Sequence, residues 1–172
     1  MTKTAIKFII LFILFVFAQA IIFNQICLFN VATPFIFIYI IVRMPITVSV
    51  NWLMSISFIL GLCVDVFSDT QGMNALACTL LAAIRRPVLL LFFPREDDIA
   101  NPEPSIRSFG FGIYIKYLLT LVLLFCCFIY TIEAFSFFNF FQLVMRIASS
   151  TLLTSLLLLG IDSISSQRQY VR

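Results

Sequence analysis

The chain has 172 residues, of which 62% are hydrophobic and 11% are charged, and its mean hydropathy is +1.12. A soluble domain is nearer to half apolar and a quarter charged, so this composition excludes an ordinary soluble domain and predicts a membrane protein. The net charge of +3 is too small and too dispersed to indicate a nucleic-acid-binding protein.

The apolar runs predict an all-α, polytopic transmembrane bundle with about six spans, because one span needs about 20 residues. The chain is then a single integral membrane domain, residues 1–172, with spans at about 8–23, 26–42, 46–67, 73–93, 113–132 and 138–161. In the first run, Ala18-Gln19-Ala20 has the small-x-small pattern of a signal-peptide cleavage site. Because Ile21, Ile22 and Phe23 continue the apolar run past that point, we interpret the segment as an uncleaved span.

Polar residues and prolines mark the limits of the middle spans. Asn30, Thr33 and Pro34 interrupt the second run and place the start of its helix near Pro34. The segment Ser68–Gly72 predicts a turn between the third and fourth spans, and Arg85-Arg86-Pro87 predicts the end of the fourth helix or a kink in it.

The segment Pro94–Arg107, with three prolines and six charges, predicts a solvated loop. With six spans, most of the basic residues lie on the side that holds both termini, whereas Arg146 lies in the opposite half. Positive charge favours the cytoplasmic side, so the loop and both termini are predicted to be cytoplasmic.

The chain contains no histidine, and its five cysteines lie in apolar runs without the spacing of metal ligands: Cys27, Cys63, Cys78, Cys126 and Cys127. It also lacks the nucleophile elbow and the Gly-rich phosphate loop of familiar enzymes. We therefore expect a non-enzymatic protein without a metal or cofactor.

Ser57, Gly61 and Asp65 are spaced by four residues and therefore share one stripe of the third helix. Small residues at such spacing allow close helix packing in lipid, which accounts for the first two. A carboxylate in an apolar segment needs another explanation. Asp65 is expected to cap the turn, to bind the first amides of the fourth helix or to pair with a cation.

Arg146 is the predicted cation, because the topology places it in the same leaflet as Asp65. The alternative is that Asp65 lies in interfacial water. In the last helix, Ser150 and Thr154 form another small-residue ridge for helix packing. Asp162 lies at the cytoplasmic end of this helix, where Lys116 is the predicted partner; a polar transport path is the less favoured interpretation.

An aromatic-rich turn, Phe135-Ser-Phe-Phe-Asn-Phe-Phe141, connects the last two spans. Such a turn is typical of an aromatic belt at headgroup level. The sharper hypothesis is a partner-docking face that comprises Asp69 and the aromatic residues Phe135, Phe137, Phe138, Phe140 and Phe141.

Several segments resemble MreD, a family of rod shape-determining membrane proteins. They are the run G-L-C-V-D-V-F-S-D-T-Q-G-M-N-A-L at 61–76, the helix exit A-A-I-R-R-P, the loop start F-F-P-R-E-D-D, the turn E-A-F-S-F-F-N-F and the stretch R-I-A-S-S-T-L-L-T. The resemblance covers essentially the whole chain, and its central run is the most specific part.

The resemblance implies a non-enzymatic inner-membrane scaffold that binds MreC and supports rod shape and lateral peptidoglycan synthesis. The implied complex also contains MreB, a RodA-type glycosyltransferase and a class B penicillin-binding transpeptidase. The family is distantly similar to the substrate-binding subunits of energy-coupling-factor transporters. This similarity supplies the alternative function, a membrane subunit that binds a small molecule or a lipid.

Overall fold

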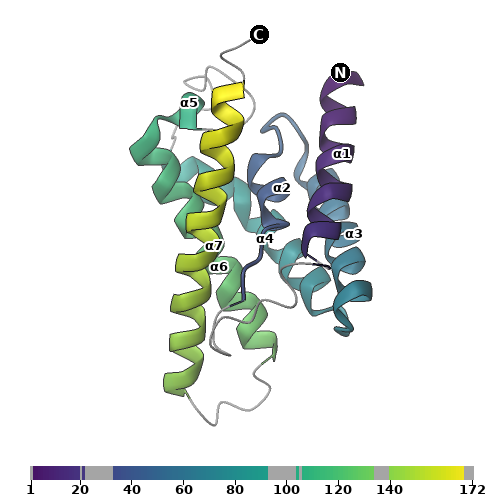
Figure 1. Ribbon diagram of the computed structural model, residues 1–172, viewed down its shortest axis with the longest axis vertical. Helices are drawn as coiled ribbons and strands as arrows, with labels where there is room; N and C mark the ends of the chain where they lie inside the picture. Colours follow the sequence, from purple (N-terminus) through teal and green to yellow (C-terminus); the bar gives the residue numbers. More distant parts are fainter. Residues whose placement is uncertain are drawn as a thin grey trace.

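The computed structural model describes residues 2–19, 21, 33–92, 104, 106–133 and 140–168. Within these ranges the chain is helical and contains no strand. The elements are α1 (Thr2–Ala18), α2 (Ile38–Arg43), α3 (Val50–Ser68), α4 (Met73–Phe92), α5 (Ile106–Phe109), α6 (Phe111–Glu133) and α7 (Phe140–Arg168). The long helices lie along one common direction, and the start of α1 and the end of α7 lie at the same end of the bundle (Figure 1).

Four of the described helices are long and apolar enough to cross a membrane: α3, α4, α6 and residues 141–163 of α7. These four agree with the predicted third to sixth spans to within a few residues at most ends, and α7 continues several residues further. The first predicted span corresponds to α1, which at 17 residues is slightly shorter than the four. The structure therefore supports a helical membrane protein, and the count of six spans remains a prediction.

The second predicted span differs most from the structure. Residues 22–32 lie outside the described residues, residues 33–35 are not helical, and α2 contains only six residues. Its helix begins at Ile38 rather than near Pro34. Every residue of α2 is buried, so this interrupted segment lies inside the protein rather than against lipid. Burial in protein is what permits non-helical backbone at membrane depth.

The predicted turn between α3 and α4 is present. Asp69 ends α3 with a left-handed backbone (φ 54°), and Gly72 has φ 75° directly before α4. Pro87 does not end α4, which continues to Phe92. A proline costs one backbone hydrogen bond, and neighbouring helices can compensate for that loss in a membrane bundle.

The centre of the bundle is formed mainly by α2, α4 and α6. The inner face of α6 is fully buried through Tyr114, Tyr117, Leu121 and Phe125. By contrast, α3 and α7 expose large apolar side chains over much of their length, as expected for surfaces that face lipid. Several polar side chains of these two helices are buried, among them Ser57, Asp65, Ser150, Thr154 and Asp162.

Candidate functional site

Asp65 caps the start of α4. Its Oδ1 accepts hydrogen bonds from the backbone and side-chain nitrogens of Asn74 at 3.1 and 3.0 Å, and Oδ2 accepts one from the amide of Ala75 at 2.9 Å. The Thr70 hydroxyl donates to the same carboxylate. Asp65 is only 4% exposed, and a buried carboxylate at a helix N-terminus is stabilised by both these donors and the helix dipole. Of the three roles that the sequence left open for Asp65, two are therefore confirmed: it caps the turn, and it binds the first amides of the fourth helix.

Arg146 does not pair with Asp65 in the structure. Its guanidinium lies 3.5 Å from Glu133 at the end of α6, and both side chains are more than one-third exposed. The reason is helix order: α7 packs on α6, whereas Asp65 belongs to the packed pair of α3 and α4. The pairing that the sequence predicted is replaced by an ion pair between the neighbouring helices α6 and α7.

Gly61 lies on a close helix contact, as its small size predicted, and the structure identifies α4 as the neighbouring helix. A Cβ atom at this position would lie 2.4 Å from the Cα of Ala75, a distance that backbone atoms cannot tolerate. Ser57, one turn earlier on the same stripe, is buried as well.

The non-helical segment before α2 is held by side chains from distant helices. The amide of Thr33 donates to the Ser150 hydroxyl at 3.2 Å, and that of Phe35 donates to the Thr154 hydroxyl at 3.2 Å. Tyr130 links the Thr33 and Ser150 hydroxyls through contacts of 2.7 Å. Ser150 and Thr154 therefore do more than permit close packing, because they replace the backbone partners that an interrupted helix loses.

The side chain of Gln19, directly after α1, also forms hydrogen bonds with the backbone of this non-helical segment. It accepts a hydrogen bond from the amide of Ile36 and donates one to the carbonyl of Pro34, both at 3.0 Å. Residues 33–36 contain three backbone N–H groups, because Pro34 has none, and each of the three donates to a side chain.

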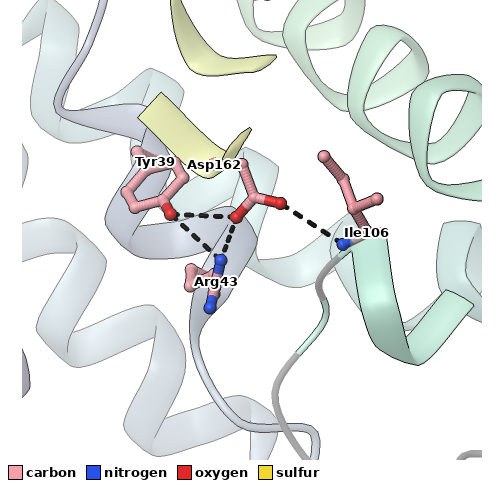
Figure 2. A network of polar contacts seen from close by, with 4 residues as sticks. All are labelled: Tyr39, Arg43, Ile106 and Asp162. Atoms are coloured by element: carbon pink, nitrogen blue, oxygen red, sulfur yellow. Dashed lines mark hydrogen bonds and ion pairs between the residues drawn. The ribbon is translucent and has the colours of Figure 1, made fainter. Parts of the chain in front are cut away.

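Asp162 is the centre of a second buried network, shown in Figure 2. Its carboxylate forms an ion pair with Arg43 and accepts a hydrogen bond from the Tyr39 hydroxyl at 3.0 Å. On its other side, the amide of Ile106 donates to Oδ2 at 3.2 Å. Asp162 is fully buried and joins α7, α2 and the short helix α5. This network ties the end of the polar loop to the core of the bundle.

Lys116 is not the partner of Asp162, contrary to the sequence-based expectation. Its side chain is exposed on α6, whereas Arg43 reaches the carboxylate from α2. The physical reason is the orientation of α6, which turns Tyr114 and Tyr117 toward the core and Lys116 outward.

Arg85 is buried next to this network and caps the C-terminal end of α2. It donates to the carbonyls of Val42 and Met44 and, through Nε, to the Tyr117 hydroxyl at 3.2 Å. The last carbonyls of a helix lack intrahelical partners and carry partial negative charge, so a cation is well placed there.

Five residues of these networks are not apparent as site residues from the sequence: Gln19, Tyr39, Arg43, Arg85 and Tyr117. Arg43 directly follows the second predicted span and Arg85 lies at the predicted end of the fourth helix, yet both are only 4% exposed. The four-residue spacing of Tyr39 and Arg43 was an available signal, because it places both side chains on one helix face.

The predicted docking face is described only in part. Phe135, Phe137 and Phe138 lie outside the described residues, and Phe140 is the first residue of α7. Phe141 is 80% exposed, and Asp69 is exposed at the turn between α3 and α4. In the described ranges, no three cysteine or acidic side chains gather as a metal site would require.

Comparisons with protein-family models, with curated proteins and with solved structures find no match to this chain. The resemblance to MreD therefore rests on the sequence segments alone, and what it implies about function is a proposal.

Proposed function

We propose that this protein is a non-enzymatic scaffold of the MreD type in the bacterial inner membrane, with both termini in the cytoplasm. In this role it stabilises MreC and supports lateral peptidoglycan synthesis together with MreB, a RodA-type glycosyltransferase and a class B penicillin-binding transpeptidase. The observation that carries the proposal is the segment 61–76, in which the resemblance is most specific and in which Asp65 fixes one helix to the next.

The use of polar side chains supports a scaffold. Asp65, Asp162, Ser150 and Thr154 bond to backbone or side-chain groups of the same chain. Such internally satisfied networks fix the relative positions of helices. The large apolar side chains remain on the outside of α3 and α7, where lipid or the single span of a partner can pack against them.

The proposed MreC-binding region lies at the end of the bundle that holds Asp69 and Phe141. Both residues are exposed there, at the turn after α3 and at the start of α7. An exposed aromatic side chain at this level is able to pack on a partner helix as well as on headgroups.

The test is co-purification with MreC in mild detergent from cells that express both proteins. The double variant Phe137→Ala, Phe138→Ala and the variant Phe141→Ala are expected to reduce MreC recovery at unchanged expression. Leu91→Ala, which removes a similarly exposed apolar side chain near the end of α4, is the matched control and should retain MreC. Depletion of the protein should make rod-shaped cells round. Equal MreC recovery with all variants and unchanged shape on depletion would reject the proposal.

The alternative is a subunit that binds a small molecule or lipid, as the distant similarity to energy-coupling-factor subunits suggests. The observation in its favour is the buried, interrupted segment 33–43, since interrupted helices form ligand sites in many transporters. Mass spectrometry of the protein purified without MreC distinguishes the two functions: a stoichiometric small molecule favours the alternative.

A further inference from the structure

Arg85 carries a buried positive charge that no carboxylate of the described chain balances. All three of its hydrogen-bond partners are neutral oxygens: the Tyr117 hydroxyl and the carbonyls of Val42 and Met44. The neighbouring Arg43, by contrast, is paired with Asp162. A buried ion whose charge is left uncompensated is costly, and an anion close to Arg85 would lower that cost.

Arg85 also lines a pocket that is suited to such an anion. The pocket lies between the start of α3, the end of α4 and the connection that precedes α3. Its lining combines two adjacent arginines with an apolar wall: Arg85, Arg86, Ile46, Val48, Val50, Leu53 and Leu89. Arg85 is at its buried side, whereas Arg86 is exposed. The cavity volume of about 20 Å³ holds roughly one water molecule, so a larger ligand would lie across the mouth beside Arg86.

The position of the pocket indicates the source of the anion. It lies where one membrane-spanning helix begins and the next ends, which is the level of lipid headgroups. Trp52, in the first turn of α3, is 70% exposed, and exposed tryptophan is typical of this interface. A phospholipid supplies both a phosphate for the arginines and an acyl chain for the apolar wall.

We propose that this pocket binds an anionic phospholipid, with the phosphate beside Arg86 and Arg85 and an acyl chain along the half-buried Val48 and Val50. The site is independent of MreC and would exist in a scaffold and in a transporter subunit alike. It would couple the packing of α3 on α4 to the lipid composition of the membrane.

The test uses the purified full-length protein in detergent and measures lipid binding by native mass spectrometry. Phosphatidylglycerol and phosphatidylcholine with identical acyl chains are titrated separately. The wild-type protein should prefer phosphatidylglycerol. Arg86→Gln should weaken that binding about fivefold, because one basic side chain near a membrane surface contributes about 1 kcal/mol. Binding of phosphatidylcholine should be unchanged.

Two variants serve as controls. Arg86→Lys keeps the charge and should keep most of the preference. Lys116→Gln removes an exposed positive charge that does not line the pocket and should change binding by less than twofold. Arg86 rather than Arg85 carries the test, because loss of the buried Arg85 would disturb folding. A titration with inorganic phosphate, which should not displace the lipid, distinguishes a lipid site from a general phosphate site.

Three results would overturn the proposal. The first is a wild-type protein without preference for phosphatidylglycerol, which is what a chain whose own carboxylates neutralise both arginines would show. The second is an equal loss of binding in Arg86→Gln and Lys116→Gln. The third is displacement of the lipid by inorganic phosphate at similar concentration.

Discussion

Asp65 and Asp162 are both buried carboxylates in helices that are long and apolar enough to cross a membrane, but their hydrogen-bond partners come from different distances along the chain. The partners of Asp65 lie five to ten residues away, within one helix hairpin. Those of Asp162 lie 56 to 123 residues away and come from two other elements, α2 and α5. Asp65 therefore stabilises a local unit, and Asp162 holds distant segments of the bundle together.

The largest expected effect comes from Asp162→Asn. The substitution removes the carboxylate that pairs with the buried Arg43, and breaking one side of a buried ion pair typically costs about 3–5 kcal/mol. The free energy of unfolding is measured by denaturant titration of the protein in detergent.

Asp69→Asn is the matched control, because this carboxylate is exposed, and the variant should unfold like the wild type. The double variant Arg43→Met, Asp162→Leu should lose less stability than Asp162→Asn alone, since it leaves no unpaired charge. If Asp162→Asn proved as stable as Asp69→Asn, the central role of this network would be refuted.

Gly61→Ala tests the local hairpin in the same assay. The added methyl group would meet the backbone of Ala75 at 2.4 Å, and overpacking of this kind costs about 1–3 kcal/mol. Gly160→Ala is the matched control in α7, because no atom lies within 4 Å of its added Cβ. Equal stability of the two variants would contradict the close packing of α3 on α4.

The contrast between the two carboxylates also explains what the sequence could predict. The turn at 68–72 and the two helices beside it follow from a local pattern: a carboxylate, a polar run and a glycine close in the chain. The small-residue stripe of Ser57 and Gly61 likewise indicates a packing face, although only the structure shows that α4 is its neighbour.

Long-range arrangements could not be predicted in the same way. The sequence does not show that α7 packs on α6 and not on the pair of α3 and α4, so the partner of Arg146 was predicted wrongly. Nor does it show that the interrupted segment folds into the bundle and brings Arg43 to Asp162. Once residues 33–43 occupy the centre, Arg43 is nearer to Asp162 than Lys116 is.

Asp65→Ala should cost about 2 kcal/mol, because it removes the acceptor for the first amides of α4 at a buried helix start. Asp65→Asn keeps one acceptor oxygen and should lose less. Thermal unfolding of the purified variants, compared with Asp69→Asn, measures the effect. A stability of Asp65→Ala equal to the wild type would mean that the cap contributes nothing.

Arg146→Gln should have the smallest effect, below about 1 kcal/mol, since its ion pair with Glu133 is more than one-third exposed on both sides.

This variant also decides between the structure and the pairing that the sequence suggested. If Arg146 acts only on Glu133, the losses of Asp65→Ala and Arg146→Gln should add in the double variant to within about 0.5 kcal/mol. A coupling energy well above that value would mean that the two side chains interact after all. Asp65 would then connect the hairpin of α3 and α4 to α7, and its contacts would be long-range, as those of Asp162 are.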